Sequence, residues 1–127
     1  MVKALVVEDE EDIRNLLVEQ LLDRGCQVRR ADNGVVALRR VREEIPDIIF
    51  VDIVMPVMDG ILFVAELRKN PETSAIPVVL VSAIDLPGLQ ARARALGVNH
   101  LLSKPWDQET LDRMLRINNE WGIPSDR

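Results

Sequence analysis

The chain has 127 residues, 47% of them hydrophobic and 29% charged, which is enough for one globular domain with its own core. Its formal net charge of −5 argues against the basic surface of a nucleic-acid-binding protein, and no apolar run reaches the roughly 20 residues of a membrane span. With one cysteine (Cys26) there is no internal disulfide, and with no signal peptide we expect a cytoplasmic protein that binds neither nucleic acid nor membrane.

The excess acidity lies in one place. Residues 8–12 are five consecutive acids, and the remaining acidic residues balance the 16 lysines and arginines. They follow the apolar run Val2–Val7, which predicts a first buried strand. Apolar residues at helical spacing then predict a helix from about Asp9 to Arg24, ended by Gly25. An acidic cluster of this kind points to a cation or a cationic partner.

The next segment predicts an edge strand and a second helix. Cys26 to Ala31 alternates apolar and polar residues, which is typical of a strand with one solvent-exposed face. Asn33-Gly34 is a turn signal, and the helical pattern after it consists of Ala37, Leu38, Val41 and Ile45.

The central segment is the unbroken apolar run in Asp47–Asp52, which stops on a carboxylate. It lies between Pro46 and Pro56, and it predicts a strand buried on both faces, as in parallel sheets. Asp59-Gly60 then opens a third helix, which Asn70-Pro71 stops.

The last third repeats the alternation of strand and helix. Ile76 to Val81 predicts a fourth strand, ending on Ser82-Ala83. Leu86 to Leu96 predicts a helix with little to bury, closed by Gly97. The final predicted elements are a strand over Val98–Ser103, ending on Lys104-Pro105, and a helix over Asp107–Trp121 with Asp107 as N-cap and Leu111, Met114 and Leu115 inward.

Five strands alternating with five helices predict a doubly wound α/β fold, with a parallel sheet in the flavodoxin-like order 2-1-3-4-5. We expect residues 1–121 to form the domain and residues 122–127 a short tail. In that order the strands that end on Glu8-Asp9, Asp52, Ser82 and Lys104 lie side by side. Their side chains are therefore predicted to converge on one crevice at the carboxyl edge of the sheet.

Each of these residues also has a purely structural explanation. Acids favour a helix N-terminus, and we prefer that explanation for Glu10, Glu11 and Asp12. The convergence of the whole set favours a site. Close carboxylates repel one another unless they share a proton or bind a cation, and an all-oxygen ligand set suits Mg²⁺. Asp52 is then placed as an oxygen nucleophile, with Lys104 and Ser82 next to a transferred phosphoryl group.

Four segments resemble the receiver domain of bacterial two-component response regulators, over about residues 3 to 120. They are Leu5-Val6-Val7-Glu8-Asp9, Asp52-Ile53-Val54-Met55-Pro56-Val57-Met58-Asp59-Gly60, Val81-Ser82-Ala83 and Ser103-Lys104-Pro105. The resemblance implies that Asp52 accepts a phosphoryl group from a histidine kinase or phosphotransfer protein. It implies that Glu8, Asp9, Asp52 and the backbone carbonyl of Val54 hold Mg²⁺ (or Mn²⁺). It further implies that Lys104 pairs with the phosphoryl group, that the Ser82 hydroxyl follows it, and that the Lys104–Pro105 peptide is cis.

The chain departs from the family at its switch. Receiver domains usually carry an aromatic residue three positions before the lysine, where this chain has Leu101, so Ser82 and Leu101 form the expected switch pair without a ring. We expect His100 to be exposed and to have no part in the site. Trp106, Met55 and Met58 are interpreted as packing residues.

We expect the surface that binds a downstream protein or an output domain to lie on the 86–120 face, with Arg92 and Arg94 available for the contact. As a switch the protein would catalyse at most its own phosphorylation and dephosphorylation. A Mg²⁺-dependent phosphatase is the first alternative, but such enzymes usually place a second Asp where this chain has Val54, and a cap over the substrate needs a longer chain. The second alternative is a receiver-like adaptor that binds partners without being phosphorylated.

Overall fold

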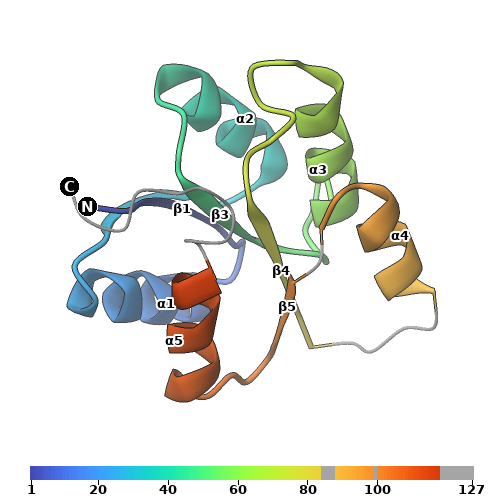
Figure 1. Cartoon of the computed structure of the whole chain (residues 1–127). Helices are drawn as coiled ribbons and strands as arrows, with labels where there is room; N and C mark the ends of the chain where they lie inside the picture. Colours follow the sequence, from blue (N-terminus) through green and yellow to red (C-terminus); the bar gives the residue numbers. More distant parts are fainter. Residues whose placement is uncertain (84–87, 99, 118–127) are drawn as a thin grey trace.

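Five parallel strands form one central sheet in the order β2-β1-β3-β4-β5 (Figure 1). The structure, a computed structural model, describes residues 1–83, 88–98 and 100–117. The strands are β1 (Lys3–Val7), β2 (Gln27–Ala31), β3 (Ile48–Asp52), β4 (Val78–Ser82) and β5 (His100–Ser103). The predicted doubly wound fold and strand order are confirmed, and β2 is an edge strand as expected.

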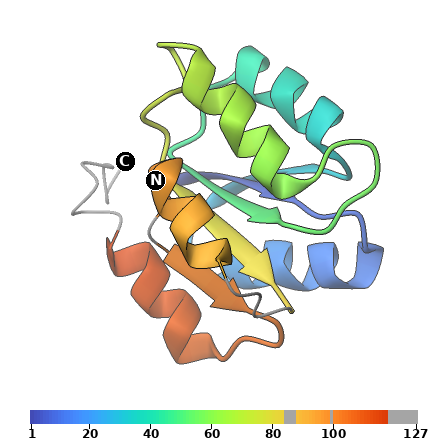
Figure 2. The ribbon, with the colours of Figure 1, turned by 90° about the vertical axis from the view of Figure 1, so that its right-hand side faces the viewer.

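The helices lie in two layers on the two faces of the sheet (Figures 1 and 2). They are α1 (Glu11–Asp23), α2 (Gly34–Glu43), α3 (Gly60–Lys69), α4 (Leu89–Ala95) and α5 (Gln108–Ile117). Helices α1 and α5 pack on one face and α2, α3 and α4 on the other, as right-handed crossovers from a central strand require. No helix among the described residues is long and apolar enough to cross a membrane.

The first four residues of strand β3 are apolar because both faces of the strand are covered. All five of its residues are buried. Ile48 and Phe50 pack in the cluster under α1 and α5, whereas Ile49 and Val51 pack in the cluster under α2, α3 and α4. The alternation of side chains along a strand sends neighbours to opposite faces, so both faces require apolar residues over positions 48–51. The strand therefore delivers its terminal residue, Asp52, to a fixed position at the edge of the sheet.

Glycine ends two of the helices in the same way. After α1, Gly25 has a φ of 84°, and the amide of Cys26 donates to the carbonyl of Leu21. After α4, Gly97 has a φ of 76°, and the amide of Val98 donates to the carbonyl of Ala93. Both are Schellman motifs, which need a residue that adopts positive φ at low cost. The predicted role of these glycines is confirmed.

Several predicted boundaries were wrong by a few residues. Helix α1 begins at Glu11 instead of Asp9, because Glu10 is extended. Helix α2 ends at Glu43, so Ile45 is not on it and is 46% exposed; Pro46 disfavours helical backbone at the residue before it. Strand β4 begins at Val78, since Pro77 has no N–H for the ladder, and β5 begins at His100, since the Val98 amide closes α4.

The last two predicted helices are observed over the described residues. Helix α4 covers Leu89–Ala95, and the predicted start at Leu86 lies outside the described residues. Helix α5 is described to Ile117, so the predicted end at Trp121 and the tail 122–127 lie outside them too. The Asp107 side chain accepts from the Thr110 amide at 2.7 Å, which confirms its capping role.

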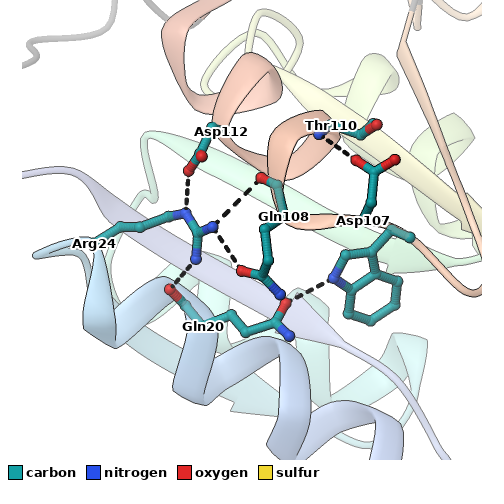
Figure 3. Close-up of polar contacts among 7 residues, drawn as sticks. Gln20, Arg24, Asp107, Gln108, Thr110 and Asp112 are labelled. Carbon is teal, nitrogen blue, oxygen red and sulfur yellow. Dashed lines mark hydrogen bonds and ion pairs between the residues drawn. The ribbon is translucent and has the colours of Figure 1, made fainter.

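Polar side chains connect α1 to α5 and to the loop before it (Figure 3). We call this set of contacts the Arg24 clasp; its residues are Gln20, Arg24, Trp106, Gln108 and Asp112. The Arg24 guanidinium contacts Asp112 Oδ1 at 2.5 Å, Gln108 Oε1 at 2.7 Å and the Gln20 carbonyl oxygen at 2.9 Å. The Trp106 ring nitrogen donates to Gln20 Oε1 at 2.7 Å, so this tryptophan also has a polar role that the sequence did not predict. The clasp holds the segment after Lys104 against α1.

Replacing Arg24 with methionine should lower the free energy of unfolding by about 2 kcal/mol, because charge-assisted hydrogen bonds between two helices are lost while the apolar stem is kept. Urea denaturation followed by circular dichroism measures the change. Arg42→Met, at an exposed position of α2, is the matched control and should stay within about 0.5 kcal/mol of wild type. Equal stability of the Arg24 variant and wild type would contradict a stabilising clasp.

Candidate functional site

The loop after β1 contributes two carboxylates that differ in exposure. Glu8 is only 3% exposed, and Asp9, the next residue, is exposed. The Glu8 amide donates to the Ala31 carbonyl of β2 at 3.0 Å, which continues the sheet by one residue. One oxygen of the Glu8 carboxylate accepts from the Glu10 amide at 3.2 Å. The second oxygen is thereby directed toward the centre of the sheet edge.

Asp52, the last residue of strand β3, lies beside the carboxylates of Glu8 and Asp9. Asp52 is 6% exposed, and its Oδ1 atom accepts from the Val54 amide at 3.3 Å. The following loop returns close to the strand, because the Gly60 amide donates to the Ile53 carbonyl at 2.9 Å. A Cβ atom at Gly60 would lie 2.3 Å from the Asp52 carbonyl oxygen, so no other residue fits without moving the strand end. The Asp59-Gly60 pair thus starts α3 and also fixes the backbone of Asp52.

Lys104 bridges the two buried carboxylates from the end of β5. Its ammonium lies 2.6 Å from Glu8 Oε1 and 3.0 Å from Asp52 Oδ2. Its backbone amide donates to the Ser82 carbonyl at 2.9 Å, which ties the end of β5 to the end of β4. The predicted cis peptide between Lys104 and Pro105 is present. Residues separated by 96 positions in the chain, Glu8 and Lys104, therefore meet at one point.

Ser82 and Val54 lie at the rim. Ser82 is half-buried and occupies the end of β4, one residue beyond Val81, the register partner of Asp52. Val54 is 61% exposed. An open hollow of about 520 Å³ at this edge is lined by Glu8, Asp9, Glu10, Asp52, Val54, Ala83 and Lys104. Apart from the predicted switch residues Ser82 and Leu101, all the predicted site residues line this one hollow.

Burial dominates the electrostatics of Glu8. Loss of solvent raises the pKa of Glu8 to about 7; hydrogen bonding to Lys104 opposes the shift, and Asp52 adds to it. Burial acts to lower the pKa of Lys104, but hydrogen bonds to Glu8 and Asp52 outweigh it, so the pKa is raised and the ammonium stays charged. One ammonium faces two buried carboxylates, so the site favours an additional positive charge.

The donor set fits a divalent cation. Carboxylate oxygens of Glu8, Asp9 and Asp52 all lie within 4.8 Å of one another. Such a spacing allows all three groups to contact one ion, and hard oxygen donors with open solvent on one side suit Mg²⁺ or Mn²⁺. The hollow has room for the water ligands that Mg²⁺ usually retains. The residues present therefore fit the metal that the sequence suggested.

Other expectations have mixed outcomes. Met55 is buried and Met58 is half-buried against the apolar core, so both are packing residues as expected. His100 is half-buried, not exposed, and lines a separate cavity with Arg68 at the opposite end of β4 and β5. This location was not predictable from the sequence, because local patterns do not show which side of the β5 start faces α3. The role of Arg14 was not predicted either, since its only signal was a lone basic residue after the run of acids.

The loop that follows Asp52 contains a strained residue. Val57 has a φ of 70°, and the Met58 amide donates to the Pro56 carbonyl at 2.8 Å, which forms a tight three-residue turn. A β-branched residue in left-handed backbone is unfavourable. Val57 is 82% exposed, so little packing offsets the strain.

Val57→Gly is therefore expected to raise the free energy of unfolding by about 1 kcal/mol, since glycine adopts positive φ at little cost. Thermal denaturation of the metal-free protein measures the change. Val35→Gly, another exposed valine but within helix α2, should be destabilising instead. A Val57→Gly protein that is less stable than wild type would show that the turn is not strained.

The fold and the site together define a class: doubly wound α/β proteins with an acidic, lysine-bridged pocket at the carboxyl edge of a parallel sheet, which can hold a divalent cation. The family model described as response regulator receiver domain matches residues 4–116. The chain thus belongs to the receiver domain family of response regulators. Members of this family are signalling domains of two-component systems, and they typically bind Mg²⁺ through acidic residues.

Individual relatives agree with this membership. The chain is 37% identical to "Protein PilH" of Pseudomonas aeruginosa over 111 residues, covering 87% of this chain and 92% of PilH. It is 35% identical to "Protein PilG" of the same organism, covering 86% of this chain and 81% of PilG. Among solved structures, Vibrio cholerae chemotaxis protein CheY4 superposes with a TM-score of 0.86 at 32% identity, over 91% of this chain and 97% of that one.

Proposed function

We propose that this receiver domain accepts a phosphoryl group on Asp52 and that the acceptance changes its binding to a downstream partner. The contact that carries the proposal is the Lys104 ammonium, which lies 2.6 Å from Glu8 and 3.0 Å from Asp52. Through this contact, a cation and a second buried carboxylate lie beside Asp52, the terminal residue of β3. A merely structural ion pair needs one carboxylate, and the second is free to react once a metal offsets its charge.

The proposed reaction is a direct transfer. A carboxylate oxygen of Asp52 attacks the phosphorus of a phosphohistidine, a P–O bond forms, and the P–N bond breaks with its electron pair left on the histidine nitrogen. No general base is needed, because the attacking oxygen carries no proton. The Lys104 ammonium then neutralises one phosphoryl oxygen, and the Ser82 hydroxyl, at the end of the neighbouring strand, donates to another. The donor is a histidine kinase or a phosphotransfer protein.

Glu8, Asp9, Asp52 and the backbone carbonyl of Val54 are the proposed holders of Mg²⁺ or Mn²⁺. A divalent cation bound there supplies charge neutralisation for the transferring phosphoryl group. The protein residues supply the ligands and their orientation: Glu8 and Asp9 bring negative charge to the rim, and the Val54 amide orients the Asp52 carboxylate. The protein acts as a switch that is modified once per event, and not as an enzyme with an external substrate.

Uneven packing of α4 and α5 supports an output route through α4. Only Leu89 and Ala93 of α4 are buried, and Arg92 and Arg94 are exposed. A hollow of about 270 Å³ separates α4 from β5 and is lined by Gln90, Ala93, Arg94, Val98 and Leu101. Helix α5 is held to α1 by the Arg24 clasp (Figure 3). We therefore propose that phosphorylation moves Ser82, that half-buried Leu101 adjusts into the hollow, and that α4 shifts against a fixed α5.

Hydrogen exchange tests this output route. With beryllofluoride and Mg²⁺ as a phosphoryl mimic, amides of residues 89–103 should change their exchange rates several-fold, because a lightly packed segment opens at low free-energy cost. Amides of α5 should change little while the clasp is intact. Equal exchange of residues 89–103 with and without the mimic would contradict the route.

The phosphorylation itself is tested by mass. Wild type is incubated with Mg²⁺ and acetyl phosphate, and the intact protein is weighed. We expect one added phosphate that hydroxylamine removes, and none in Asp52→Asn or without metal. No adduct in wild type favours a receiver-like adaptor, and repeated turnover of an unrelated phosphoester favours a phosphatase; either result overturns the proposal.

A further inference from the structure

We infer that Arg14 is a positioning residue for cation binding, one that holds the loop of residues 8–10 in the conformation that brings Glu8 and Asp9 together. This inference rests on the proposed Mg²⁺ binding. Arg14 lies in α1 and is half-buried, and its guanidinium donates to the backbone carbonyl of Glu8 at 2.9 Å. Since Arg14 contacts the main chain of a ligand residue and not its carboxylate, its effect would pass through the position of the loop.

The loop depends on this contact because its other hydrogen bonds do not reach the Glu8 carbonyl. The Glu8 amide donates to the Ala31 carbonyl at 3.0 Å, and the Glu8 carbonyl accepts from Arg14 at 2.9 Å, so both backbone polar groups of this residue are hydrogen-bonded. Glu10, the N-cap of α1, makes no side-chain capping bond. Among the described residues, no hydrogen bond or ion pair to the Asp9 side chain is found. Without the Arg14 side chain, the loop would keep its bonds at the Glu8 amide and at Glu10, but the Glu8 carbonyl, which precedes Asp9, would lose its partner.

Positioning and simple electrostatics make opposite predictions for Arg14. A cation near the acidic cluster repels Mg²⁺, so removal of its charge alone should tighten metal binding. A residue that holds the ligands in place does the reverse, because removal adds an ordering cost to metal binding. Supporting residues around metal ligands typically change affinity by 10–100-fold when mutated. The sign of the change in Mg²⁺ affinity therefore decides between the two roles.

Isothermal titration calorimetry with MgCl₂ measures that sign. Arg14→Met keeps the apolar stem and removes the charge and the donors; we expect about tenfold weaker binding than wild type. Arg14→Lys keeps a charge and a donor on a shorter side chain, and should restore binding to within about threefold of wild type. Arg39→Met, an exposed arginine of α2 away from the site, removes the same charge and should bind Mg²⁺ as wild type does.

A second readout separates positioning from loss of stability. Phosphorylation by acetyl phosphate should be slower in Arg14→Met at low Mg²⁺ and should recover at saturating Mg²⁺, because the variant is impaired only in binding the ion. Equal or tighter Mg²⁺ binding in Arg14→Met, or a phosphorylation defect that saturating Mg²⁺ does not relieve, overturns the inference. Failure of wild type to bind Mg²⁺ is distinguishable, since it overturns the proposed function itself.

Discussion

Asp52→Asn should make the metal-free protein more stable at pH 8, by on the order of 2 kcal/mol, although it removes one half of an ion pair. In wild type the Lys104 ammonium faces both Glu8 and Asp52, so one buried carboxylate charge is in excess. An asparagine at residue 52 keeps an oxygen that accepts from Lys104 and adds an amide that donates to Glu8. The repulsion disappears, and the one bond lost is the 3.3 Å bond of the Val54 amide to Oδ1, at the solvent-exposed rim where water can replace it.

The same substitution should reduce the stabilisation by Mg²⁺, because one of three carboxylates in the cluster is lost. Thermal denaturation of both proteins, with EDTA and with saturating MgCl₂, measures the two effects together. Asp23→Asn, at an exposed position of α1, is the control for loss of one negative charge and should change neither quantity much. A metal-free Asp52→Asn protein that melts at or below the wild-type temperature would refute the excess-charge argument.

The metal-free protein should lose stability as the pH rises from about 4.5 to about 7, by on the order of 3 kcal/mol. The cause is Glu8, whose pKa is raised from 4.5 to about 7 mainly by burial. A carboxyl group with a higher pKa in the folded state binds protons more tightly there than in the unfolded chain. Its contribution is therefore complete below pH 4.5 and is lost as the pH rises through 7.

Two other carboxyl groups act in the opposite direction but at lower pH. The pKa of Glu43 is lowered by its hydrogen bond to Arg29, and that of Asp107 by its capping bond to Thr110. Their contributions are lost as the pH falls below the ordinary carboxyl values, outside the window in which Glu8 titrates. Saturating Mg²⁺ should reverse the slope between pH 5 and 7, since the ion binds the ionised form of Glu8.

Urea denaturation at intervals between pH 5 and 8, in EDTA, tests the prediction. Glu8→Gln has no proton to lose at this position and should show a much flatter profile, which also separates Glu8 from His100, the one histidine of the chain. A wild-type profile that rises from pH 5 to 7 in the absence of metal would show that Glu8 is ionised throughout.

The strand order and the approximate site followed from local patterns. The unbroken apolar run of β3 has one physical explanation in a chain of this length, a strand covered on both faces, and its acid end must then lie at the edge of the sheet. Helix ends were predictable where a single residue decides them, as at Gly25 and Gly97. Boundaries near prolines were less accurate, because Pro46 and Pro77 affect neighbours in ways that apolar spacing does not report.

The sequence by itself therefore determined the sheet order, the family and the set of strand-end residues that meet, because side-chain alternation and chain connectivity are local properties. Only the tertiary structure decided how those residues divide their contacts. It shows that Lys104 bridges Glu8 and Asp52, that burial raises the pKa of Glu8, and that Arg14 holds the Glu8 carbonyl. Desolvation and hydrogen-bond direction depend on atoms from distant segments, and no pattern along one chain encodes which of them come within 3 Å of one another.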